Sequence, residues 1–293
     1  MGKFARDRRD IFYRKAKQEG WRARSAYKLL QLDEEFDLLN DSVVRAVDLC
    51  AAPGSWSQVL ASKLWAEGED KTDHPDRSAR IVAVDLQEMT PIPGVRILRG
   101  DITSKETAEK VVHSFGGGKA QLVISDGAPD VTGLHDLDEF VQAQLLLAAL
   151  NLATFLLEEN GTFVAKIFRG KDVTLLYAQF EVFFKSVTIA KPLSSRISSA
   201  EAFVVCQGFR LPENFVPSFD SPLKAVSYGP KSEPMTGPKR SIARFVACGD
   251  VDGPGGYDPN RSYALEPDAT FKEPIQPPIH PSHQEAAEKL RKQ

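Results

Sequence analysis

The stretch VDLCAAPGSWSQVL at residues 47–60 decides the fold of this chain. A short apolar strand ends near Asp48, a turn of small residues follows, and a helix begins near Ser55. Small side chains let a ligand approach the backbone, and the first helical turn offers N–H groups without intrahelical partners. Turns that bind a dinucleotide read GxGxxG, whereas this one reads AAPGSW and lacks the N–H donor of Pro53. The turn therefore disfavours a pyrophosphate and leaves open a site for an uncharged nucleoside or amino-acid group.

The rest of the chain as far as residue 210 alternates between apolar strands and helical patterns. This alternation predicts an α/β fold with a doubly wound, seven-stranded, mostly parallel sheet. The segment 193–201 is too short for a crossover helix, so the last two strands are expected to pair antiparallel. Residues 243–250 could add a strand and residues 283–293 a short helix. Strands are expected at 43–49, 80–86, 95–101, 120–126, 161–168, 186–192 and 202–209, and helices at 55–65, 137–157 and 172–183.

Acidic residues stand at the ends of the first four strands, at Asp48, Asp85, Asp101 and Asp126. The carboxyl ends of parallel strands meet at the edge where open α/β sheets bind ligands. There Asp85 could accept hydrogen bonds from a ribose diol, Asp101 could meet an adenine amino group, and Asp126 could face a cationic centre. Any one of them alone could equally be a strand-end or cap residue, but four in series favour a binding site.

The composition is that of a globular protein, with 42% hydrophobic and 26% charged residues among 293. No apolar run of about 18 residues occurs, so no membrane span is expected. The first residues lack the apolar core of a signal peptide, and the three cysteines are far apart, so a reducing, cytoplasmic location is expected. The five histidines show no ligand spacing, and no metal site is expected.

The net charge of −3 hides a basic N-terminal arm, because residues 1–28 hold ten basic and three acidic residues. Such an arm suits a polyanionic partner, although a solvated, frayed terminus would have the same composition. Aromatic residues between the cations could stack on bases, or could dock the arm onto the body. The candidate RNA-binding residues are Arg8, Arg9, Arg14, Lys15, Arg22, Arg24 and Tyr27.

Four motifs resemble the S-adenosylmethionine site of the FtsJ/RrmJ ribose 2′-O-methyltransferases: DLCAAPGSWSQ (48–58), AVDLQ (83–87), GDIT (100–103) and SDGAPD (125–130). The resemblance covers residues 6–210 or so and implies a Rossmann-like class I methyltransferase that uses S-adenosylmethionine. The cofactor-binding positions that it implies are Asp48, Ala52, Pro53, Gly54, Ser55, Trp56, Asp85, Leu86, Asp101, Ile102 and Asp126.

The same family uses a Lys–Asp–Lys–Glu set, which matches Lys28, Asp126, Lys166 and Glu201 here. Lys28 alone would pass for a surface lysine, and the whole set for a structural ion cluster. Lys166, however, interrupts an apolar strand and therefore needs partners. The resemblance implies that Asp126 orients Lys166 and that Lys28 and Glu201 orient the target ribose. Whether Lys166 accepts the hydroxyl proton or stabilises the alkoxide stays open.

The resemblance is strongest to the eukaryotic tRNA anticodon-loop branch, on DGAPDVTGLHDLDEFVQAQLLLAALN (126–151), IFRGKDVTLLYAQF (167–180), RSYALEP (261–267) and PIQPPIHPSHQEA (274–286). It implies the ribose 2′-hydroxyl of nucleotides 32 and 34 as substrate. It also implies two auxiliary proteins, a WD-repeat protein for position 34 and a large helical-repeat protein for position 32.

The expected organisation is a basic RNA-binding arm and helix at 1–40, a methyltransferase domain at 41–210, and a Pro/Gly-rich extension at 211–293 that could dock a partner. Three other functions stay open. They are methylation of ribosomal RNA, an NAD-dependent oxidoreductase, and a non-catalytic RNA-binding subunit on the same fold.

Overall fold

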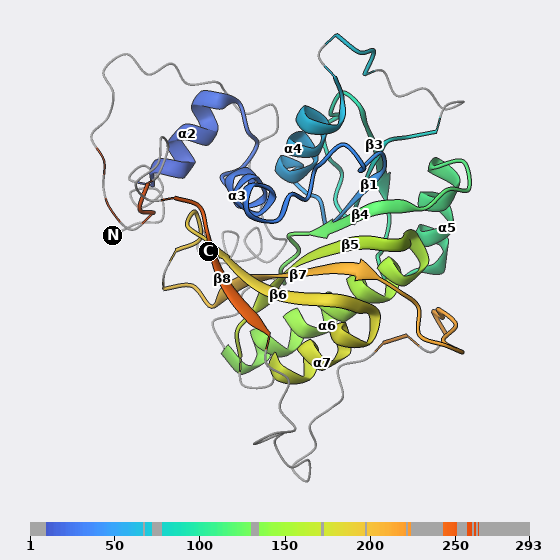
Figure 1. Cartoon of the computed structure of the whole chain (residues 1–293). Coiled ribbons are helices and arrows are strands. Elements are labelled where there is room, and N and C mark those ends of the chain that lie inside the picture. The colour runs from blue at the N-terminus through green and yellow to red at the C-terminus, as the bar shows by residue number, and fades with distance from the viewer. Residues whose placement is uncertain are drawn as a thin grey trace, which may run out of the picture.

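The computed structural model describes residues 10–66, 68–71, 78–129, 135–170, 173–196, 198–220, 222–223, 243–250, 257–259, 261 and 263. Within this part of the chain, one twisted sheet is covered by helices on both faces (Figure 1). Its strands are β1 (Ala46–Leu49), β2 (Ile81–Asp85), β3 (Val95–Arg99), β4 (Ala120–Ser125), β5 (Leu157–Phe168), β6 (Phe184–Pro192), β7 (Glu201–Phe209) and β8 (Arg244–Cys248).

The strand order is β3-β2-β1-β4-β5-β7-β6-β8. The strands from β3 to β5 run parallel, and β7 pairs antiparallel with both β5 and β6. The doubly wound, mostly parallel sheet with an antiparallel seventh strand is therefore confirmed. The additional strand that the sequence left open is also present, because β8 pairs parallel with β6 and makes an eighth strand.

Helices form a layer on each side of the sheet. The described helices are α2 (Ile11–Glu19), which lies apart from the sheet, and α3 (Ala26–Phe36), α4 (Ser55–Leu64), α5 (Lys105–Ser114), α6 (His135–Leu156) and α7 (Val173–Phe183). The helices α5, α6 and α7 pack on one face, and α3 and α4 pack on the other (Figure 1). The central strands β1 and β2 are apolar almost throughout, because both of their faces are buried.

Helix α6 is long and apolar enough to cross a membrane by length and composition alone, over Asp136–Leu156. No single apolar run in the sequence indicated such a segment. Its side chains Leu146, Leu147 and Leu150 are fully buried in the core cluster that lines this face of the sheet. Burial in the protein interior therefore accounts for the apolar character of this helix.

The N-terminal helix α2 is capped by Asp10 and is attached to the rest of the protein by aromatic contacts. The Asp10 carboxylate accepts a hydrogen bond from the Tyr13 N–H at 3.1 Å, which caps the helix. The Phe12 ring packs against Tyr27 at 5.3 Å and against Tyr257 at 6.4 Å between ring centroids. Residues of the C-terminal extension thus contact α2. The helix expected at 283–293 lies outside the described residues.

Candidate active site

The small residues that the sequence shows after β1 form the turn between β1 and α4. Gly54 is the N-cap of α4 and adopts a left-handed conformation with φ of 102°. The N–H group of Ala52 donates to the Asp85 carboxylate at 2.9 Å, so the end of β2 holds the turn in place. The turn and Asp85 therefore lie together at the carboxyl edge of the sheet.

Arg22 closes this turn from the side of α3. Its guanidinium donates to the carbonyl oxygens of Pro53 at 3.0 Å and Pro91 at 2.9 Å. A Cβ atom placed on Gly54 would lie 2.7 Å from Cδ1 of Ile92 and 3.0 Å from Nη1 of Arg22. The backbone at Gly54 thus has no room for a side chain, and Arg22 packs against the small-residue turn.

The other predicted cofactor-binding residues divide into accessible and buried ones. Asp85, Leu86 and Asp101 lie at the carboxyl ends of β2 and β3 with accessible surface, and Leu86 is 63% exposed. The neighbouring Ala52 and Pro53 are partly accessible, whereas Ser55 and Ile102 are buried.

Trp56 and Asp48 are fully enclosed. The indole N–H of Trp56 donates to the Ser25 carbonyl at 2.8 Å, and its ring packs against Phe203 at 5.5 Å. The Asp48 carboxylate accepts a hydrogen bond from the Ser57 hydroxyl at 2.6 Å, and burial raises the pKa of Asp48 to about 7. Both side chains therefore support the turn from inside the protein.

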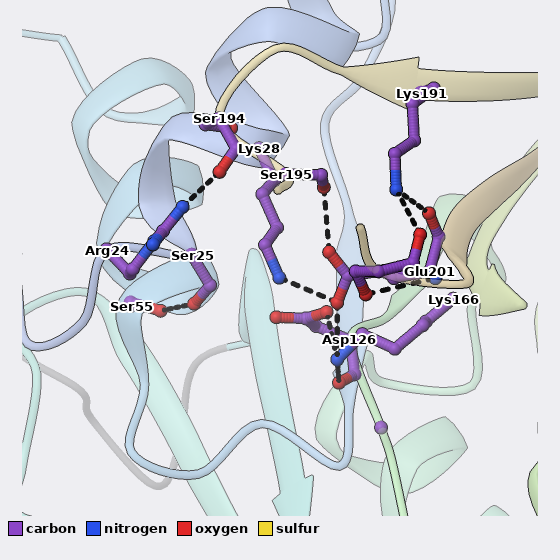
Figure 2. A network of polar contacts seen from close by, with 12 residues as sticks. Arg24, Ser25, Lys28, Ser55, Asp126, Lys166, Lys191, Ser194, Ser195 and Glu201 are labelled. Carbon is purple, nitrogen blue, oxygen red and sulfur yellow. Dashed lines mark hydrogen bonds and ion pairs between the residues drawn. The ribbon is translucent and has the colours of Figure 1, made fainter. Parts of the chain in front are cut away.

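The four residues of the predicted Lys–Asp–Lys–Glu set form one connected group (Figure 2). Lys166 on β5 places Nζ 2.7 Å from Oδ1 of Asp126 and 3.5 Å from Oε2 of Glu201. Lys28 on α3 places Nζ 2.8 Å from the same Oε2 atom. The antiparallel course of β7 makes this possible, because Glu201 at its start pairs with Phe168 at the end of β5.

This group lies beside the small-residue turn between β1 and α4. Ser25, three residues before Lys28, has its hydroxyl oxygen 2.6 Å from that of Ser55 at the start of α4 (Figure 2). The strands β1, β4 and β5 are adjacent, so Asp126 follows β4 next to the end of β1. The carboxyl edge of the sheet therefore carries both the small-residue turn and the charged group.

Burial and the neighbouring charges set the ionisation of the group. Burial alone would lower the pKa of Lys166, but the carboxylates of Asp126 and Glu201 outweigh it and raise that pKa above its usual value. Burial alone would raise the pKa of Glu201, but Lys28 and Lys166 lower it to about 2. At neutral pH the group therefore holds a protonated Lys166 and an ionised Glu201.

Two residues that the sequence did not single out support this group. Ser195 donates its hydroxyl to Oε1 of Glu201 at 2.7 Å. The side-chain amide of Gln142 on α6 donates to the carbonyl oxygens of Gly127 at 3.2 Å and Lys166 at 3.0 Å. A polar residue on the buried face of a largely apolar helix was the available signal for Gln142. Other polar residues of this helix are buried too, namely Asp138, Asn151 and Thr154. The serine stands in a polar loop, where its sequence context offers no comparable signal.

The predicted RNA-binding residues are largely occupied with contacts inside the chain. Arg8 and Arg9 lie outside the described residues. Arg24 donates to the Asp10 carboxylate and the Ser194 carbonyl, and Arg14 donates to the Tyr263 carbonyl at 3.0 Å. Lys15 lies 4.5 Å from the centroid of the Tyr257 ring. Tyr27 packs on Phe12. These contacts agree with the alternative that the aromatic and basic residues of the arm dock it onto the body of the protein. Binding of RNA by these residues stays a prediction.

Among the described residues, no group of three or more His, Cys, Asp or Glu side chains could hold a metal ion. The cysteines Cys50, Cys206 and Cys248 are free.

Comparison with protein families and curated proteins identifies clear relatives. A family model described as FtsJ-like methyltransferase matches residues 21–209. The human tRNA (cytidine(32)/guanosine(34)-2′-O)-methyltransferase is 55% identical over 100% of this chain and 86% of its own length. The Schizosaccharomyces pombe protein of the same name is 52% identical over 98% of this chain and 97% of its own length.

Two further relatives are more distant. The AdoMet-dependent rRNA methyltransferase spb1 of Aspergillus fumigatus is 43% identical over 75% of this chain, which corresponds to 26% of that protein. Among solved structures, a Plasmodium falciparum protein described as a ribosomal RNA methyltransferase matches with a TM-score of 0.55 and 24% identity. The match covers 64% of this chain and 98% of that one, and it supports the fold.

Proposed function

Because this chain belongs to the FtsJ-like methyltransferase family, we propose that it methylates the ribose 2′-hydroxyl of nucleotides 32 and 34 in the tRNA anticodon loop. The observation that carries the proposal is the connected group of Lys28, Asp126, Lys166 and Glu201 beside the Gly54 turn. Relatives that are named for this reaction match the chain over its whole length, which supports the choice of substrate.

The residues of the turn fit S-adenosylmethionine as the methyl donor. When bound, this cofactor supplies an electrophilic methyl group on a positively charged sulfur. The backbone of the turn beside Gly54 would face its amino-acid part, and the Asp85 carboxylate, which already accepts the Ala52 N–H, would accept hydrogen bonds from the ribose diol. Asp101 would meet the adenine amino group, and Asp126 would face the positive sulfur. The carboxylates thus match the donors and the charge of this cofactor.

The charged group performs two tasks in this proposal. Lys28 and Glu201 orient the target ribose, which places its hydroxyl oxygen in line with the methyl group. Lys166 is held protonated by its two carboxylate neighbours and stabilises the negative charge that develops on the ribose oxygen as its proton leaves to solvent. Proton acceptance by Lys166 would need the neutral amine, which those neighbours disfavour.

The proposal extends to protein partners and to the compartment. Among the described arm cations, Arg14 and Arg24 are engaged in contacts within the chain. The rest of the chain carries a net negative charge, which disfavours the binding of a whole tRNA by this chain alone. Separate subunits would then bind the rest of the tRNA, a WD-repeat protein for position 34 and a large helical-repeat protein for position 32.

The compartment is proposed to be the cytoplasm. The three free cysteines agree with a reducing compartment.

A labelled-methyl transfer assay on unmodified tRNA, with and without candidate subunits, tests the function. Lys166→Ala is expected to abolish transfer while calorimetry still detects binding of S-adenosylmethionine. Lys185→Ala is the matched control, because Lys185 is an exposed lysine that contacts Asn160 at 2.5 Å. Transfer by Lys166→Ala at the wild-type rate would refute the site.

Mapping the methylated nucleotide decides the substrate. Labelling of ribosomal RNA in place of tRNA would favour the rRNA alternative. Binding of NAD without S-adenosylmethionine would favour an oxidoreductase. Binding of tRNA without methyl transfer, even with the subunits present, would favour a non-catalytic RNA-binding role.

A further inference from the structure

The two oxygens of the Glu201 carboxylate have different partners (Figure 2). Oε2 lies 2.8 Å from Nζ of Lys28 and 3.5 Å from Nζ of Lys166. Oε1 accepts the hydroxyl of Ser195 at 2.7 Å and pairs with neither lysine amine. A hydrogen bond on Oε1 opposes rotation of the carboxylate about its last bond. The serine therefore keeps Oε2 directed at both lysine amines.

The loop that carries Ser195 connects β6 to β7, and its β7 end is fixed by Lys191. The amine of Lys191 on β6 donates to the carbonyl oxygens of Ser199, at 2.9 Å, and of Glu201. The N–H group of Glu201 donates to the Ser199 hydroxyl at 3.2 Å. These contacts fix the backbone of Ser199 and Glu201 independently of the contacts that the Glu201 carboxylate makes.

The other end of the loop is fixed to α2 and α3. Arg24 donates to the Ser194 carbonyl (Figure 2). It also donates to the Asp10 carboxylate, to which Arg196 donates as well, at 3.2 Å. The Ser194 N–H group donates to the side chain of Gln31 on α3 at 2.9 Å. Asp10 is only 4% exposed, and a buried carboxylate with two arginine partners is costly to disrupt.

From these contacts we propose that Ser195 is a positioning residue for the catalytic carboxylate of Glu201, and that the Arg24–Asp10–Arg196 group holds Ser195 in place. The inference rests on the proposed function, because it concerns the group that orients the target ribose. It also gives Asp10, the N-cap of α2 in the N-terminal arm, a role in the reaction.

Ser195→Ala and its neighbour Ser194→Ala provide a matched pair of variants. Both residues are buried in the same loop, but the Ser194 hydroxyl has no hydrogen-bond partner among the described residues. Ser195→Ala is expected to lower kcat for tRNA methylation about tenfold, the scale of one hydrogen bond to a charged group. The KM for tRNA and the Kd for S-adenosylmethionine are expected to stay unchanged, and Ser194→Ala is expected to keep the wild-type kcat.

A double-mutant cycle tests the connection to α2. Asp10→Asn removes the charge that holds both arginines but keeps a side chain that caps the helix. If Asp10 acts through Ser195, the effects of Asp10→Asn and Ser195→Ala on kcat are less than additive when combined. Additive effects would overturn the connection to α2.

Equal behaviour of Ser195→Ala and Ser194→Ala, or a change confined to KM or thermal stability, would overturn the positioning role alone. A wild-type chain that transfers no methyl group with its subunits present would overturn the proposed function, and this inference with it.

Discussion

The ionised Glu201 carboxylate contributes to folding stability, and Glu201→Gln removes that contribution. The two lysines lower the pKa of Glu201 from 4.5 to about 2 in the folded protein. Each unit of difference between the folded and unfolded pKa values corresponds to about 1.4 kcal/mol of unfolding free energy. The carboxylate therefore stabilises the folded chain by roughly 3 kcal/mol at neutral pH, which Glu201→Gln is expected to lose.

The pH dependence has a defined sign. Because the folded pKa lies below the unfolded one, the unfolded chain binds more protons as the pH falls. The stabilisation is complete above pH 4.5 and disappears as the pH falls towards about 2. The difference in unfolding free energy between wild type and Glu201→Gln should shrink across the same range.

Urea unfolding, followed by tryptophan fluorescence from pH 7 down to acidic pH, measures this difference. Glu88→Gln is the control, because the Glu88 side chain is 84% exposed and its contact with Arg99 at 3.2 Å is a surface ion pair of little energetic value. A difference that stays constant with pH, or one no larger than that of Glu88→Gln, would refute the electrostatic reasoning.

Three further substitutions test the small-residue turn and the charged group. Lys166→Arg should transfer methyl groups at least about tenfold faster than Lys166→Ala, because arginine keeps the charge but cannot accept a proton. Equally inactive variants in the transfer assay would favour proton acceptance. Gly54→Ala should weaken S-adenosylmethionine binding at least about tenfold in calorimetry, since its φ is 102° and Ile92 would lie 2.7 Å from the new Cβ. An unchanged Kd would contradict that placement. Arg22→Ala should weaken the same binding about fivefold through its lost contact with Pro53, without changing tRNA affinity in filter binding. A loss confined to tRNA affinity would instead support the predicted RNA contact.

Sequence patterns were sufficient for most of the sheet, because fully buried parallel strands read as short apolar runs. The strand β2, for example, is an unbroken run of buried residues that ends at Asp85. The helix α5 was not predicted, since its buried side chains include only two apolar ones, Ala108 and Val111, and the other two are polar. The strand β8 stayed open at the sequence level because it is an edge strand in which only Cys248 is fully buried.

The charged group could be anticipated because its four members match the motifs of the family that the sequence resembles, and because Lys166 stands inside an apolar strand. Lys28 on its own offered only the context of a surface lysine.

The contacts that support the group could not be anticipated, because they join residues far apart in the chain. Arg24 reaches Ser194 and Arg196 reaches Asp10 only after the sheet has assembled. Arg22 was assigned to RNA on its charge, and its contact with the small-residue turn depends on where α3 packs.

The position of β7 has a consequence for how the chain is made. β7 lies between β5 and β6, although it follows both of them in the sequence. During synthesis, the free edge of β5 remains uncovered until residues 201–209 have left the ribosome, and such edges promote aggregation of nascent chains. Since Glu201 is the first residue of β7, the pairing of this strand with β5 also completes the charged group. A nascent chain that stops before this strand would leave the edge of β5 uncovered and would lack Glu201.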